Sequence, residues 1–154
     1  MENVLGIDLN IKYSERIVLL TNKGIALWDV LQSCQRSGSL DTNIIIEEQN
    51  DFESFFTSYN NIKAIFFNGG KAYNLYLNMV LPYLSEDKRK LPMKQLPSTS
   101  PANTKVSISK KIEIWKKELH VYFLLRRSFI IITQLSQFIS ITFSLNHAGR
   151  LFTK

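Results

Sequence analysis

The chain has 154 residues, of which 45% are hydrophobic and 21% are charged, and this predicts one compact domain with an ordinary core. Its eighteen aromatic residues and few Gly and Pro residues exclude collagen-like and disordered classes. The single cysteine, Cys34, excludes an internal disulfide and any zinc site built from several cysteines. It fits a reducing cytoplasm, which is where we expect the protein to be.

The net charge of +6 favours anionic partners, either nucleic acid or a membrane surface. Two thirds of this excess comes from the end of the chain, because residues 119–154 hold four basic residues and no acidic one. We therefore treat residues 1–118 as the expected domain and residues 119–154 as a basic, apolar segment of its own.

The first half of the chain indicates alternating helices and strands. Residues 14–20 favour a short helix that ends at Gly24, and the apolar run 24–31 is typical of a strand buried on both faces. The polar residues 32–42 indicate a loop, and a further short element can begin at Ile44. Aromatic residues at helical spacing then predict a helix over 51–59, capped by Asp51.

The second half begins with a strand over 62–67, followed by a Gly-Gly turn and a helix over 71–83, which together form a βα unit. A short strand over 91–96, a polar loop over 97–103 and a helix over 108–125 follow. This alternation predicts an α/β fold, a three-layer α/β/α sandwich with a small parallel sheet. We expect the strands at 25–30 and 62–67 to be adjacent and to lie between the helices at 51–59 and 71–82.

The C-terminal segment allows more than one interpretation. Residues 128–145 are uncharged, and the length of this segment is near that of a membrane span. Eight of its 18 residues, however, are Ser, Thr or Gln. Residues 139–145 alternate with period two, which is typical of a strand. A packed strand or helix, a poorly ordered segment and a membrane-associated segment all stay open.

Three segments carry the strongest functional signal, and each follows a predicted strand or contains one. They read GIALWDVLQSC from residue 24, IKAIFFNGGKAY from residue 62 and LPSTSPAN from residue 96. In order and spacing they resemble the uracil-DNA glycosylase superfamily, and specifically its hypoxanthine (deoxyinosine) branch. The resemblance covers about residues 4–117, three quarters of the chain.

The resemblance implies a DNA repair enzyme that acts in base excision. Such an enzyme flips a deaminated base, hypoxanthine or uracil, out of duplex DNA and hydrolyses its N-glycosidic bond, leaving an abasic site. It implies no metal and no organic cofactor. The expected partner is double-stranded DNA that contains a deaminated base, and we expect a monomer.

The polar loop suits contact with the DNA backbone. Its prolines stiffen it, while its hydroxyl and N–H groups can bind phosphate oxygens. A simple surface turn is the alternative. The expected DNA-binding residues are Arg36, Pro97, Ser98, Thr99, Ser100, Pro101 and Asn103.

Strand ends supply the expected substrate-binding residues, Trp28, Asn68 and Gly69. The Asn68 amide can bind a base edge or cap the following helix. Trp28 can line the pocket or belong to the core, with Asp29 bound by loop N–H groups. No residue is an evident base for the attacking water, so Asp29 and Asn68 are only candidates for catalysis.

One family feature is not found, namely the first strand and motif, which in the family position the hydrolytic water. We therefore expect a domain shortened at its front that releases bases slowly or not at all, unless it is a non-catalytic fragment or a DNA-binding remnant. A parallel sheet that lacks its central strand has unpaired backbone groups. Either the C-terminal segment takes that place or the domain is weakened.

Overall fold

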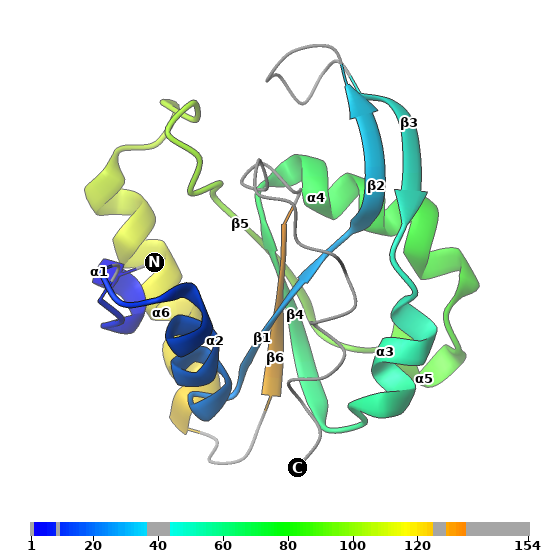
Figure 1. Ribbon diagram of the computed structural model, residues 1–154, viewed down its shortest axis with the longest axis horizontal. Helices are drawn as coiled ribbons and strands as arrows, with labels where there is room; N and C mark the ends of the chain where they lie inside the picture. The colour runs from blue at the N-terminus through cyan, green and yellow to red at the C-terminus, as the bar shows by residue number, and fades with distance from the viewer. Residues whose placement is uncertain (1, 9, 37–43, 125–128, 135–154) are drawn as a thin grey trace.

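A four-stranded, all-parallel sheet forms the middle layer of the molecule (Figure 1). The computed structural model describes residues 2–8, 10–36, 44–124 and 129–134. In spatial order the strands are β1 (Ile25–Asp29), β6 (Phe129–Gln134), β4 (Ile62–Asn68) and β5 (Met93–Leu96). The prediction of an α/β fold with a small parallel sheet is confirmed.

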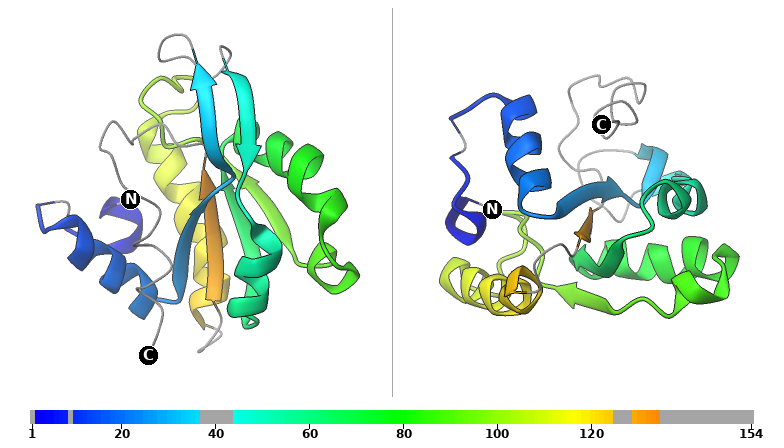
Figure 2. Two further views of the ribbon diagram at one scale, coloured as in Figure 1. Left: turned by 45° about the vertical axis from the view of Figure 1, so that its right-hand side comes forward. Right: turned by 90° about the horizontal axis from the view of Figure 1, so that it is seen from below.

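Helices cover both faces of this sheet (Figure 2). One face carries α1 (Glu2–Leu5), α2 (Tyr13–Asn22) and α6 (Ile108–Leu124). The other face carries α3 (Phe52–Ser58) and α4 (Gly70–Leu75), which continues as a π-helical turn η2 (Tyr76–Val80) and a 3-10 turn η3 (Leu81–Tyr83). The short helix α5 (Glu86–Arg89) lies on the same side.

Strand β4 shows why its sequence is apolar almost throughout. Successive side chains of a strand point to opposite faces of the sheet. Ile65 and Phe67 pack into the core beneath α3 and α4, whereas Ala64 and Phe66 pack into the core beneath α2 and α6. All four are at most 1% exposed, as expected for a parallel strand covered on both sides.

The prediction that β1 and β4 are adjacent in the sheet is wrong, because β6 lies between them. Ile25 of β1 is in register with Ile130, and Ile65 of β4 with Ile131, so β6 pairs with both strands. Part of the C-terminal segment thus takes the central place in the sheet. Chain order does not reveal this, since a strand from any part of the chain can complete a parallel sheet.

The expected distribution of helices is also wrong in one respect. The helices predicted at 51–59 and 71–82 were placed on opposite sides of the sheet, but both lie on the same face. Phe52 of α3 contacts Tyr76 edge to face, with ring centroids 5.1 Å apart, in one shared core. The opposite face is covered by α2 and by α6, whose Trp115 and Leu119 are buried there.

The segment predicted as a polar loop over 32–42 contains a strand instead. Strand β2 (Leu31–Arg36) pairs antiparallel with β3 (Ile44–Gln49) in a hairpin separate from the main sheet. Backbone pairing stabilises such a hairpin without an apolar pattern, which is why polarity was a poor guide. The buried Asn50 fixes its base, since Asn50 Nδ2 donates to the Asp29 carbonyl oxygen at 2.8 Å.

The helix cap at Asp51 is confirmed. Its carboxylate accepts hydrogen bonds from the Ser54 hydroxyl at 2.6 Å and the Ser54 backbone N–H at 2.9 Å. These hydrogen bonds lower the pKa of the Asp51 carboxyl below its usual value. At α2, by contrast, the cap position is Lys12, with no side-chain hydrogen bond.

Within the described residues, no helix has the length and apolar character that a membrane crossing requires. Of the segment 128–145, residues 129–134 form β6, and the strand predicted over 139–145 lies outside the described residues.

The central place of β6 predicts a large effect from a small truncation. Ile131 is completely buried, so Ile131→Ala should lower the free energy of unfolding by about 2–5 kcal/mol. Ile108→Ala is the matched control, because Ile108 is 75% exposed and should change stability by about 0.5 kcal/mol or less. Urea unfolding measures both, and equal effects would contradict the position of β6.

Candidate functional site

The three segments singled out in the sequence meet at one edge of the sheet. Parallel strands end on the same side, and β1 ends there at Asp29, β4 at Asn68 and β5 at Leu96 (Figure 1). The polar loop 97–103 leaves β5 at this edge. This is where open α/β sheets bind their ligands.

The Asn68 amide holds the polar loop at two points. Its Nδ2 donates to Thr99 Oγ1 at 2.9 Å, and its Oδ1 accepts from the Thr99 backbone N–H at 2.8 Å. Asn68 does not cap the following helix, because the cap position of α4 is Gly69. An amide has two N–H donors and two acceptor positions on its oxygen, so one of each is left for a ligand.

Gly69 lets the loop approach the strand end. Its φ of +101° is a conformation that other residues rarely adopt. A Cβ at this position would lie 2.9 Å from Ser98 Cβ, closer than real contacts allow. The Gly69 backbone N–H donates to the Leu96 carbonyl oxygen at 3.0 Å, which joins the end of β5 to the turn.

Three hydroxyls of the loop share one arrangement. Ser98 Oγ accepts from the Ser100 N–H at 3.2 Å, and Ser100 Oγ accepts from the Ala102 N–H at 3.3 Å. Thr99 Oγ1 accepts from Asn68, as described above. Each hydroxyl oxygen thus already accepts a hydrogen bond, and in these contacts its own O–H stays available to donate. The loop N–H groups, by contrast, are largely used within the loop.

Trp28 packs on the face that α3 covers. Its ring lies 4.5 Å from the ring of Phe55, centroid to centroid. Its Nε1 is buried and has no hydrogen-bond partner among the described residues. The side chain therefore belongs to the core and also carries an unsatisfied donor near the end of β1.

The predicted Arg36 lies apart from the other site residues. Its backbone ends β2 opposite Ile44, in a hairpin that extends beyond the carboxyl edge of the sheet (Figure 1). Its side chain is not among those described. Asn68, Gly69 and the loop 97–103 contact one another, whereas Trp28 and Asp29 end β1 at the same edge of the sheet, with β6 between β1 and β4.

Two residues of α6 that were not predicted as site residues anchor the loop from below. Trp115 Nε1 donates to the Pro97 carbonyl oxygen at 2.9 Å. The buried Lys111 donates to the carbonyl oxygens of Asn103 and Ser100, at 2.6 and 3.4 Å. Positions 111, 115 and 119 share one face of the helix. Lys111 stands in an otherwise apolar stripe of the helix, and in the sequence this is a signal of a buried lysine that binds polar groups nearby.

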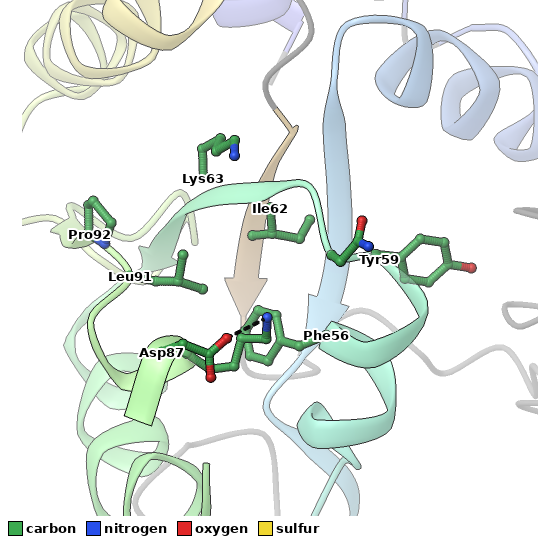
Figure 3. A pocket seen from close by; sticks show the side chains of 9 residues that line it. Phe56, Tyr59, Ile62, Lys63, Asp87, Leu91 and Pro92 are labelled. Carbon is green, nitrogen blue, oxygen red and sulfur yellow. Dashed lines mark ion pairs between the residues drawn. The ribbon is translucent and has the colours of Figure 1, made fainter. Parts of the chain in front are cut away.

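A separate pocket of about 350 Å³ lies at the opposite edge of the sheet (Figure 3). Ile62 begins β4 there, and Phe56, Leu91 and Pro92 add apolar walls. The hydrogen bond from Lys88 lowers the pKa of the Asp87 carboxyl to about 2, so this carboxyl is ionised at neutral pH. The pocket lies at the start of β4, at the other end of this strand from Asn68, and is not the candidate site.

Comparison with known proteins supports a glycosylase likeness. A protein named hypoxanthine DNA glycosylase from Methanosarcina barkeri is 38% identical over 71 residues, 46% of this chain and 45% of that protein. A protein of the same name from Methanosarcina acetivorans is 34% identical over 101 residues, 66% of this chain and 60% of that protein. No protein-family model and no solved structure matches the chain.

The predicted resemblance to the hypoxanthine DNA glycosylase branch is thus confirmed, and so is an α/β fold consistent with it. The chain spans about half to three fifths of the length of these relatives.

Gly69 provides a test of the loop geometry. Gly69→Ala should destabilise the protein by more than about 1 kcal/mol, because its φ and the nearby Ser98 both resist a Cβ. Gly70→Ala is the matched control, since its Cβ would meet only the flexible Gln95 side chain, at 3.3 Å. Urea unfolding should show the control to be neutral or stabilised. Equal losses in both variants would contradict the close approach.

Proposed function

We propose that this chain is a DNA repair glycosylase that flips a deaminated base, hypoxanthine or uracil, out of duplex DNA and hydrolyses its N-glycosidic bond. The observation that carries the proposal is the loop 97–103, held by Asn68 beside the end of β4, with three hydroxyls able to donate. The names of the two relatives supply the substrate class.

In this proposal the loop binds the DNA backbone. Phosphate oxygens only accept hydrogen bonds, so the O–H groups of Ser98, Thr99 and Ser100 suit them. Each hydroxyl receives a hydrogen bond from another group, which polarises its own O–H. Pro97 and Pro101 limit the loop's freedom, so little conformational entropy is lost when DNA binds. Asn103 closes the loop through its Nδ2, which donates to the Ser98 carbonyl oxygen at 3.3 Å.

The flipped base would lie against Trp28, Asn68 and Gly69. Hypoxanthine offers a carbonyl acceptor beside an N–H donor, and the unused donor and acceptor of the Asn68 amide complement this pair. The buried Trp28 Nε1 lacks a partner, and an unsatisfied buried donor costs about 1–3 kcal/mol. A base carbonyl in reach of this N–H would remove that cost.

For the hydrolytic step we assign the attacking water to the end of β1. Asp29 supplies a carboxylate at the same edge as the base site, which suits a group that orients water and takes its proton. The step needs water alone. Among the described residues, no group of three or more His, Cys, Asp or Glu side chains is placed to hold a metal ion.

We place this activity in the cytoplasm and assign it to a monomer whose partner is duplex DNA with a deaminated base. Arg36 is the expected additional phosphate contact, at the end of β2. A cation there would supply the salt-dependent part of the affinity.

Base release is the direct test. The purified chain should produce abasic sites in a duplex with one deoxyinosine, and not in the undamaged duplex, under single-turnover conditions. Asp29→Asn should slow release by about 10²-fold or more if its carboxylate handles the water. Asp87→Asn, at the opposite edge of the sheet, is the matched control and should leave the rate unchanged.

The outcomes separate the alternatives. Selective binding of the deoxyinosine duplex without release would indicate a DNA-binding remnant. If the chain neither binds the deoxyinosine duplex selectively nor releases the base, the proposal is refuted. Full activity in Asp29→Asn would transfer the catalytic role to another group, with Asn68 as the next candidate.

The assignment of the loop to phosphates has its own test. The double change Ser98→Ala and Ser100→Ala should weaken DNA binding on the order of tenfold, and about equally across duplex sequences. Ser58→Ala is the control, because Ser58 ends α3 away from the loop. Fluorescence anisotropy measures both. A loss confined to one sequence context would show instead that the loop contacts bases.

A further inference from the structure

We propose that Lys111 is a positioning residue for DNA binding, whose buried ammonium both fixes the loop 97–103 and places a positive charge beneath it. This inference rests on the proposed function, since the loop is taken as the phosphate contact. Lys111 belongs to α6 and touches none of the groups assigned to base release.

The contacts of Lys111 define what it holds. Its Nζ donates to the Asn103 carbonyl oxygen at 2.6 Å and to the Ser100 carbonyl oxygen at 3.4 Å. These two carbonyls close the last part of the loop, where the Asn103 N–H also donates to the Ser100 carbonyl oxygen at 3.1 Å. One ammonium thus binds two carbonyl oxygens of the turn over residues 100–103, on the side that faces α6.

The surroundings of this ammonium are unusual for a lysine. Lys111 is only 8% exposed, and lysine is almost never fully buried unless it is paired. No ion pair of the described residues includes Lys111, whereas its neighbour Lys110 is 56% exposed and pairs with Glu113. Among the described residues, the partners that balance the charge of Lys111 are therefore the carbonyl dipoles of Ser100 and Asn103.

A charge in this position has two effects on a phosphate at the loop. By drawing the carbonyl oxygens inward, it leaves the hydroxyls of Ser98, Thr99 and Ser100 as the polar groups toward the ligand. It also adds a positive potential that water screens little, because the group is buried. A phosphate can benefit from this charge without contacting the side chain.

Trp115 shows that simple anchoring does not require a charge. Its indole N–H already holds the loop's first residue through the Pro97 carbonyl oxygen. A neutral side chain at position 111 could fill the space as well, and position 111 lies in the stripe that includes the buried Trp115 and Leu119. We therefore assign the Lys111 ammonium two roles, namely to fix the loop and to attract the phosphate that binds to the loop.

The test compares Lys111→Met with Lys110→Met, which removes the same charge from the adjacent exposed position. Hydrogen exchange of the Thr99 and Asn103 amides, followed by NMR, reports the loop, and the Ile65 amide in β4 reports global opening. Lys111→Met should accelerate exchange at both loop amides about tenfold, relative to Ile65. Lys110→Met should leave these rates unchanged.

DNA binding is measured on the same variants by fluorescence anisotropy with the deoxyinosine duplex. Lys111→Met should weaken binding on the order of tenfold and Lys110→Met about twofold or less. Lys111→Arg retains the charge and should recover part of the affinity, which a purely structural role would not predict. If Lys111→Met does not fold, Lys111→Gln and Lys111→Arg carry the same comparison.

Each result has a defined meaning. Unchanged loop exchange in Lys111→Met would overturn the positioning role. Faster exchange with DNA affinity equal to that of Lys110→Met would overturn the electrostatic role. If the unmodified chain does not bind DNA, the proposed function is refuted, and the role of Lys111 in DNA binding is refuted with it. The exchange rates would still decide whether Lys111 fixes the loop.

Discussion

The central strand β6 is the element on which the rest of this structure depends. It pairs with β1 on one side and with β4 on the other, so the two halves of the sheet are joined through it. Ile130 and Ile132 contribute to one core and Ile131 to the other. Without these backbone pairs, β1 and β4 would each have an unpaired edge inside the protein, which is costly for buried N–H and C=O groups.

The candidate site is a consequence of this arrangement. Parallel pairing aligns the ends of β1, β4 and β5 at one edge, and Asn68 then joins β4 to the loop that follows β5. Gly69 allows the close approach, and α6 supports the loop from below through Lys111 and Trp115. The end of β4 and helix α6, two segments distant in the chain, thus hold one loop in one conformation.

Sequence patterns were reliable where a feature is local. The apolar run of β4, the cap at Asp51 and the strand-turn-helix order at residues 62–83 all depend on neighbouring residues and were predicted. The three motif segments were also enough to indicate the glycosylase likeness that the relatives confirm. The β2–β3 hairpin was missed, because backbone pairing by itself leaves little trace in hydrophobic periodicity.

The sequence by itself determined the α/β class, most helices and strands, and the residue types available at the strand ends. Only the tertiary structure decided that β6 separates β1 from β4, that α3 and α4 share a face, and that Asn68 binds Thr99 rather than capping α4. The reason is physical: local periodicity records which residues are buried, whereas the partner of a strand or of an amide is chosen by packing between segments distant in the chain.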